Sequence, residues 1–173
     1  MNGREFRVFN LMDDYTRELV LQIVDTSISG VRIAKKLTEL AKIRSLPEYL
    51  VSYNGHKLRS SVMFKWAQDN KVKLSFIVPG KPQQNAFVES LNGKFRKECL
   101  DLNCFGDLIE IKDVIMNWRL DYNQNRPHRA LNYIPPAKFQ ENYENNVDSK
   151  RVTLHMVQKM GHGNSPVFYC IMR

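Results

Sequence analysis

The stretch PGKPQQNAFVES, residues 79–90, decides the fold class when it is taken together with the tripeptide YNG at residues 53–55. The Pro-Gly pair ends an apolar run, and apolar residues then return at steps of three or four, which predicts a helix with Glu89 near its start. Thirty-five residues, 54–88, separate Tyr53 from Glu89. These two positions define the candidate site.

Strand-like and helix-like patterns alternate around these two segments. Apolar runs bounded by turn residues predict strands over 6–12, 18–24, 49–52 and 72–78. Apolar residues at helical spacing predict helices over 29–42, 60–70, 85–100 and 107–122. The first two strands are separated by a turn and favour an antiparallel hairpin, and the later strand, helix, strand order indicates an α/β layer.

Composition restricts the classes of partner. The chain has 173 residues, enough for one domain with a sizeable core, and a net charge of +8 with a pI near 9.5. The basic residues are spread over several segments, which favours DNA or RNA over a lipid surface, although a soluble basic protein without such a partner would have the same composition. Neither a membrane span nor a signal peptide is expected. Three cysteines without a C-x-x-C pair fit a reducing cytoplasm.

Residues 4–141 resemble the C-terminal two-thirds of the integrase core of bacterial insertion-sequence transposases, the Asp-Asp-Glu class that is also related to retroviral integrases. Four segments carry this resemblance in order: residues 7–18, residues 79–96, WRLDYNQNRPHRAL at 118–131, and PAKF at 136–139. The third contains the Tyr-Asn-x-x-Arg-Pro-His motif that closes the family's frames. The resemblance implies a partial catalytic core over residues 1–141. Residues 142–173 form a C-terminal tail that it leaves unassigned.

The family's fold and chemistry are implied by this resemblance. We expect an α/β, ribonuclease-H-like integrase core, a mixed sheet flanked by helices, that lacks its first strand. The family cuts and joins DNA with Mg²⁺ or Mn²⁺, and its partners are insertion-element ends and target DNA. The resemblance also implies a homo-oligomer, or a hetero-oligomer with an intact transposase, located in the cytoplasm and on the nucleoid when bound to DNA.

The chain departs from the family at the acids. Tyr53 stands at the position of the second aspartate, and the first aspartate belongs to an opening strand upstream of residue 2 that this sequence does not contain. Glu89 is the only retained acid, and a single carboxylate is a weak metal ligand at best. An ordinary tyrosine is neutral at pH 7 because its pKa is ~10. We therefore expect no productive metal binding, and open strand edges where the first strand is missing.

The candidate DNA-binding residues lie in or directly after two of the segments that carry the resemblance, 79–96 and 118–131. They are Lys81, Gln84, Asn85, Asn92, Lys94, Arg96, Lys97, Arg126, His128 and Arg129. The basic residues after Glu89 lie on one edge of the predicted helix, where they could follow a phosphate backbone or form a solvated helix face. His128 could contact phosphate or hold its own loop in place. Asp13 and Asp14 fall in the hairpin turn, where the resemblance gives acidic residues a structural role.

Three functions fit this sequence. The first is a transposase-derived, DNA-binding protein of DNA transposition and integration that is catalytically inactive. The second is an active, metal-dependent strand-transfer enzyme in a longer form of the chain, whose complete site would include a further acid. The third is a non-catalytic partner or inhibitor of an intact transposase.

Overall fold

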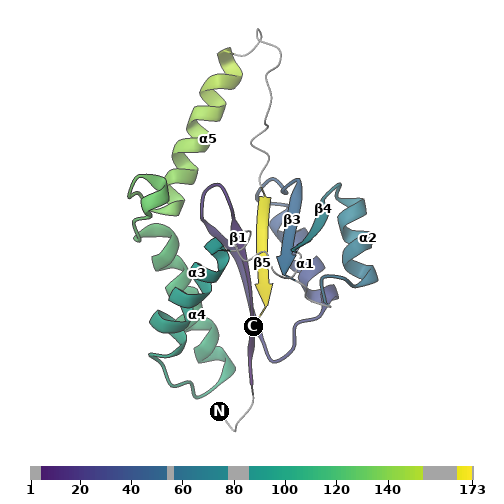
Figure 1. The fold of residues 1–173 in the computed structure, drawn as a ribbon, viewed down its shortest axis with the longest axis vertical. Coiled ribbons are helices and arrows are strands. Elements are labelled where there is room, and N and C mark those ends of the chain that lie inside the picture. Colours follow the sequence, from purple (N-terminus) through teal and green to yellow (C-terminus); the bar gives the residue numbers. More distant parts are fainter. Residues whose placement is uncertain (1–4, 54–56, 78–85, 154–166, 173) are drawn as a thin grey trace.

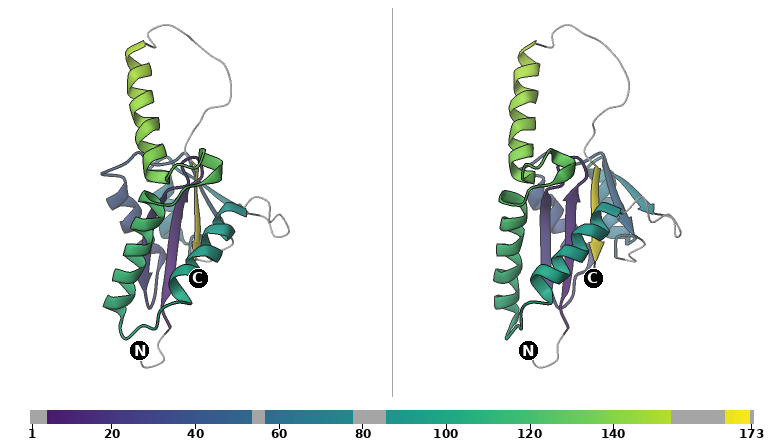
Figure 2. Two further views of the ribbon diagram at one scale, coloured as in Figure 1. Left: turned by 90° about the vertical axis from the view of Figure 1, so that its left-hand side faces the viewer. Right: turned by 60° about the vertical axis from the view of Figure 1, so that its left-hand side comes forward.

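The computed structural model describes residues 5–53, 57–77, 86–153 and 167–172. Its strands are β1 (Arg7–Asp13), β2 (Leu19–Asp25), β3 (Tyr49–Tyr53), β4 (Lys73–Ile77) and β5 (Val167–Met172). They form one mixed sheet in the order β2-β1-β5-β3-β4, with helices on both faces (Figures 1 and 2). In these residues no helix is long and apolar enough to cross a membrane. The expected α/β architecture is confirmed.

The hairpin of β1 and β2 is held at its turn by Asp13. The Oδ1 atom of Asp13 accepts hydrogen bonds from the backbone N–H groups of Tyr15 and Thr16, at 2.9 and 3.3 Å. Its Oδ2 atom accepts one from Arg44 at 3.1 Å. This carboxylate therefore stabilises the turn, as the sequence predicts for an Asp at this position.

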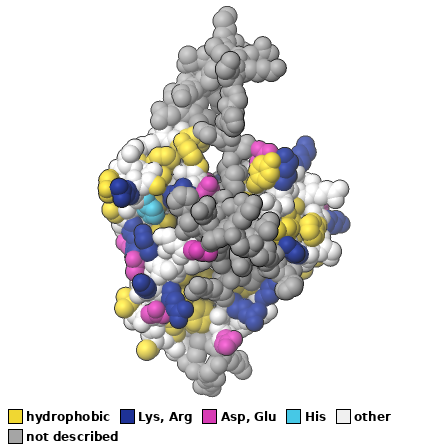
Figure 3. Space-filling view, viewed as in Figure 1, with side chains coloured by type: hydrophobic (Ala, Val, Ile, Leu, Met, Phe, Trp, Pro, Cys, Tyr) yellow, Lys and Arg dark blue, Asp and Glu magenta, His cyan; other side chains and the backbone are white. Residues whose placement is uncertain are grey.

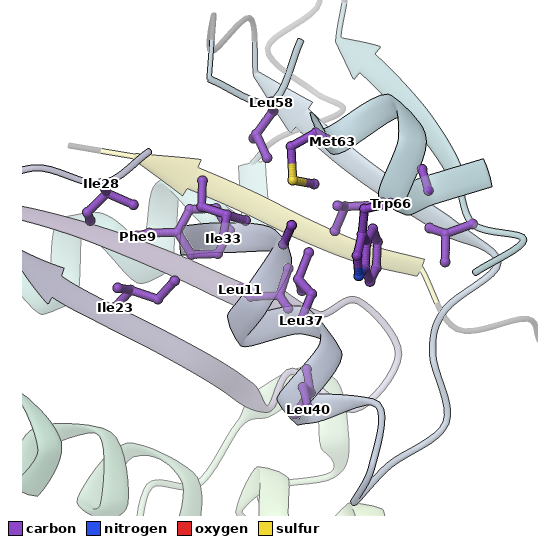
Figure 4. Packing of buried hydrophobic residues seen from close by; sticks show 14 residues of the cluster. Phe9, Leu11, Ile23, Ile28, Ile33, Leu37, Leu40, Leu58, Met63 and Trp66 are labelled. Carbon is purple, nitrogen blue, oxygen red and sulfur yellow. The ribbon is translucent and has the colours of Figure 1, made fainter. Parts of the chain in front are cut away.

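One face of the sheet is covered by α1 (Gly30–Leu40) and α2 (Ser61–Asp69). Each helix begins after a serine whose hydroxyl accepts a hydrogen bond from a backbone N–H in the first turn, Ser29 from Arg32 and Ser60 from Met63. The buried side chains of the two helices form a continuous core with those of β1, β2 and β3 (Figure 4). Its fully buried members are Phe9, Leu11, Ile28, Ile33, Leu37, Leu50, Leu58 and Met63.

The opposite face is covered by α3 (Ala86–Phe95) and α4 (Leu108–Gln124). The helix predicted over 85–100 is confirmed, and its last turn, Arg96–Leu100, is a π-helix. Asp107 caps α4 by accepting hydrogen bonds from the backbone N–H groups of Ile109 and Glu110. The buried side chains of this second core are Val8, Met12, Leu19, Val24, Val88, Leu91, Phe95, Cys99, Ile111, Ile115, Trp118 and Tyr122.

The centre of the sheet differs from the expectation of open strand edges. The C-terminal strand β5 lies between β1 and β3, antiparallel to β1 and parallel to β3. It pairs Phe168–Met172 with Asp13–Phe9 on one side, and Val167–Cys170 with Tyr49–Ser52 on the other. The apolar run at 167–172, left unassigned from the sequence, therefore supplies the central strand.

A long helix precedes this strand. The helix α5 (Pro136–Thr153) begins beside the body of the molecule, where Phe139 and Tyr143 pack edge-on against the ring of Tyr15 at centroid distances of 5.5 and 5.2 Å. It then runs away from the sheet (Figure 1). The boundary expected at residue 141 falls inside this helix.

Candidate functional site

The position of Tyr53 is fixed by the parallel strand pair. Tyr53 is the last residue of β3, and the register places it beside Ile77 of β4. The strand on its other side is β5, whose sequence VFYCIM contains no acidic residue. Carboxylates at this end of the sheet must therefore come from outside β3 and its two neighbouring strands.

Glu89 lies in the first turn of α3 and is exposed to solvent. The neighbouring Val88 is buried in the second core, so the helix presents Glu89 beside its packed face. Within the described part of the chain, no side chain makes a hydrogen bond or an ion pair with Glu89. The carboxylate is therefore an accessible charge with no side-chain partner among the described residues.

A buried amide pair attaches α3 to the sheet. The Nδ2 atom of Asn10 on β1 donates to Oδ1 of Asn92 at 3.0 Å, and both side chains are buried. Asn92 was predicted to contact DNA, but in this structure its amide is turned toward β1. A cavity of about 110 Å³ lies beside the pair and is lined by Phe6, Val8, Asn10, Asn92, Phe95, Arg96 and Leu100. The pair was not foreseen because its members are 82 residues apart.

Three predicted basic residues follow on the outer surface of α3 and its π-helical turn. Lys94, Arg96 and Lys97 are exposed, and Arg96 makes only a long ion pair, 3.5 Å, with the exposed Asp101. Such exposed pairs constrain a side chain little. On the side of the molecule formed by α3 and α4, Lys and Arg side chains alternate with Asp and Glu (Figure 3). The three residues thus form an accessible basic segment, called the α3 basic segment below.

Arg126 of the closing motif is held by its own surroundings. Its Nε atom donates to Asp121 at 2.7 Å, its Nη1 atom pairs with Glu98, and its guanidinium lies over the ring of Trp118, 5.3 Å from the centroid. These contacts tie the end of α4 to the π-helical turn. Because these contacts occupy N–H donors of the guanidinium, fewer donors remain for a phosphate than the sequence suggested.

Tyr122 and Asn123 connect the same motif to the edge strand β2. The side-chain amide of Asn123 donates to the carbonyl of Leu19 at 3.1 Å and accepts from its backbone N–H at 2.9 Å. The hydroxyl of Tyr122 donates to the carbonyl of Arg17 at 3.3 Å, and burial raises the pKa of this tyrosine far above its ordinary value. The motif is therefore attached to the start of β2 and to the turn before it.

His128 packs edge-on against Tyr122, with the ring centroids 4.9 Å apart. Burial lowers the pKa of His128 to about 4, and the nearby positive charges of Lys94, Arg17 and Arg126 lower it further in the same direction. The imidazole is therefore neutral at pH 7 and cannot act there as a cation toward phosphate. Arg129, the next residue, is exposed.

The remaining candidates lie outside the described residues. Lys81, Gln84 and Asn85 belong to the segment 78–85, which precedes α3. Their predicted contact with DNA stays a prediction.

A divalent metal centre requires several ligand side chains close together. The described residues contain no group of three His, Cys, Asp or Glu side chains placed to hold a metal. The segments outside the described residues contain neither Asp nor Glu. Hard cations such as Mg²⁺ prefer several oxygen ligands, usually including carboxylates. Glu89 alone does not provide such a set.

Comparison with known families gives a match to the integrase core domain over residues 70–136. The matched region contains β4, α3 and α4 and extends through the closing motif to the start of α5. The two segments on which the sequence resemblance rested most, residues 79–96 and 118–131, both lie within it.

Relatives occur in insertion elements. The chain is 41% identical over 148 residues to an uncharacterized 31.7 kDa protein of insertion element IS407 from Burkholderia multivorans, covering 86% of this chain and 53% of the relative. It is 42% identical over 142 residues to an uncharacterized 39.2 kDa protein of insertion element IS476 from Xanthomonas euvesicatoria, covering 82% of this chain and 41% of the relative. The chain thus spans about half the length of these relatives.

Solved structures share the fold. The catalytic core domain of HTLV-2 integrase, solved with magnesium in a trimeric form, superposes with a TM-score of 0.61 at 13% identity over 80% of this chain and 87% of that one. A chain of the simian T-cell lymphotropic virus intasome, solved with a PP2A regulatory subunit, gives 0.65 at 10% identity over 92% of this chain and 52% of that one. At these identities the likeness concerns the fold alone.

Proposed function

Because residues 70–136 match the integrase core domain and insertion-element proteins are 41–42% identical to this chain, we propose that it belongs to that family and is a transposase-derived protein that binds DNA without cutting it. The observation that carries the proposal is the isolation of Glu89. It is an exposed carboxylate on α3, and the described residues contain no group of three His, Cys, Asp or Glu side chains placed to hold a metal. The last residue of β3 is Tyr53, where the resemblance calls for an aspartate.

The chemistry of strand transfer explains why this isolation matters. In a two-metal mechanism the ions are roughly 3.5–4 Å apart and stabilise both the attacking and the leaving oxygen of an in-line displacement. Holding two such ions requires several anionic oxygens, whereas β3, β4 and β5 supply none at this end of the sheet. We therefore derive no catalytic step through a metal for this chain.

DNA binding is supported by a different set of residues. The α3 basic segment and Arg129 are exposed, and the chain has a net charge of +8. Lysine and arginine contacts to phosphate give affinity that does not depend on the DNA sequence. This affinity falls steeply as the salt concentration rises, because binding then gains less from the release of counterions. Lys81, Gln84 and Asn85 would extend this surface at the start of α3. Arg126 and His128 would contribute by holding the surface in place, because their side chains are already engaged.

Fluorescence anisotropy with a labelled duplex tests the binding surface. We expect Lys94→Ala combined with Lys97→Ala to weaken binding and to lower the slope of log K against log salt by about 2, since each phosphate contact contributes ~0.9 to that slope. The matched control is Lys35→Ala with Lys65→Ala, two exposed lysines on the α1 and α2 side of the sheet. If both pairs reduce the slope equally, the α3 basic segment is not the DNA surface and only net charge matters.

Titration calorimetry with Mn²⁺ tests the other half of the proposal. We expect no saturable binding to the folded chain, and no difference between the chain and its Glu89→Gln variant. Stoichiometric binding that is lost on Glu89→Gln would show that a metal site forms after all.

A further inference from the structure

The sheet depends on its last strand for continuity. Without β5 the remaining strands form two separate pairs, the β1–β2 hairpin and the parallel pair β3–β4, and β1 and β3 are not neighbours. Two-stranded sheets are marginally stable alone, and an unpaired edge attracts other strands. The place between β1 and β3, called the strand slot below, therefore has two strand edges that need a partner.

The strand slot specifies the kind of segment that fits it. Its occupant must run antiparallel to β1 and parallel to β3 at the same time, as β5 does over Val167–Met172. The occupant is also apolar throughout, as expected for a central strand with both faces covered by helices. A segment of six residues with this direction and composition is the ligand that the slot selects.

The pairing of β5 in the strand slot does not depend on how β5 is connected to the rest of the chain. Thirteen residues, 154–166, join the end of α5 to the start of β5. Thr153, at the end of α5, lies ten helical steps beyond Tyr143, which packs on Tyr15, so the helix carries the start of the connection ~15 Å farther along its axis. The backbone hydrogen bonds in the slot would be the same if the strand came from another molecule.

We propose that the strand slot is an exchange site that accepts residues 167–172 of a second copy of this chain. Exchange of an identical element is a low-cost route to a dimer because the contacts are already optimised in the monomer. The thirteen-residue connection makes pairing with the chain's own strand intramolecular, with an effective concentration on the order of millimolar. The strand therefore stays in its own molecule in dilute solution, and exchange between molecules grows with protein concentration and with any shortening of the connection.

Disulfide trapping between two versions of the full chain tests this proposal. The acceptor carries Ser52→Cys, Cys170→Ser and Cys104→Ser, and the donor carries only Cys104→Ser. Residues 52 and 170 are register partners on neighbouring parallel strands ~4.8 Å apart, within the Cα separation that a disulfide spans. Cys99 can remain because burial raises its pKa to about 11, which keeps the thiol protonated and slow to oxidise.

We expect the mixed and oxidised pair to give a covalent heterodimer linked between positions 52 and 170. Its fraction should rise with protein concentration toward the millimolar range. The control acceptor carries Ser75→Cys in place of Ser52→Cys, because β4 is separated from β5 by β3. Linkage no greater than that of the Ser75→Cys acceptor at every concentration would overturn the proposal.

A variant with a shortened connection gives a second, independent result. Deleting residues 155–165 leaves three Cα steps, ~11 Å, between α5 and β5, which is less than the ~15 Å that α5 extends beyond Tyr143. We expect light scattering to give a dimer for this variant, with Ser52→Cys linked to Cys170 of the other copy. A folded monomer with the link inside one chain would overturn the proposal.

Discussion

The closing motif and the candidate catalytic edge differ in the contacts that their side chains make. At the closing motif, Tyr122, Asn123 and Arg126 make hydrogen bonds or ion pairs to β2, α4 and the π-helical turn. At the candidate catalytic edge, the last residue of β3 is Tyr53, and Glu89 is exposed with no side-chain partner among the described residues. The closing motif is thus fixed by contacts within the fold, whereas the proposed loss of chemistry concerns an edge where such contacts are not seen among the described residues.

The largest expected effect lies in the core beneath the closing motif. Trp118 is buried between Phe95 and Tyr122, with ring centroids 4.9 and 5.3 Å away. Trp118→Ala should lower the free energy of unfolding by about 3–5 kcal/mol, the usual cost of emptying such a site. Urea denaturation measures this change, and Met116→Ala, an exposed residue on the same helix, should change it by less than ~0.5 kcal/mol. Equal effects would mean that α4 is not packed as described.

The next effect depends on pH. Because the folded-state pKa of His128 is about 4 against an ordinary 6.5, the unfolded chain binds a proton between these values that the folded chain does not. The free energy of unfolding should therefore rise by up to about 3 kcal/mol from this group as pH increases from 4 to 6.5, and it should then level off.

His128→Gln should flatten that part of the profile. Thermal melts of both proteins across pH 4–8 give the comparison, because carboxylates contribute equally to the two curves. If the two profiles are parallel, His128 is not buried against Tyr122.

A smaller effect is expected at the edge of the sheet. Asn123→Ala removes both hydrogen bonds to Leu19 and should cost about 1–3 kcal/mol, since the N–H and C=O of Leu19 lose their partner at the strand's start. The neighbouring exposed Gln124→Ala is the matched control. Hydrogen exchange at Leu19 should accelerate in the first variant and stay unchanged in the second.

The smallest effect is expected at the catalytic edge. Glu89→Gln should alter the free energy of unfolding by less than ~0.5 kcal/mol, because the side chain is exposed. Tyr53→Asp should not create metal-dependent cleavage, because positions 53 and 89 would still provide only two acids. Metal-dependent DNA cleavage by the Tyr53→Asp variant would show that a single substitution is enough to make the candidate catalytic edge active.

Sequence patterns predicted most of the fold but missed its centre. The helices over 29–42 and 107–122 could be predicted because their apolar residues recur at helical steps and face a core. The strand β5 could not be placed, because a short apolar run carries no information about neighbours more than a hundred residues away. The helix α5 was missed because its contacts with Tyr15 come from the aromatic residues Phe139 and Tyr143 rather than from a regular apolar stripe.

The candidate site was predicted unevenly. Glu89 and the exposed residues Lys94 and Lys97 were found because the motif places them on one helix edge. The roles of Asn92 and Arg126 were not found, because their partners Asn10 and Glu98 are 82 and 28 residues away in sequence. Residue type marked these positions, and only the fold showed what they contact.

The most direct test of the account is a cleavage assay on the full chain with a DNA duplex that carries insertion-element ends, in Mg²⁺ or Mn²⁺. We expect a salt-sensitive complex with the duplex and no nicked or joined strand. A nicked or joined product that requires the metal and disappears in Glu89→Gln would contradict it.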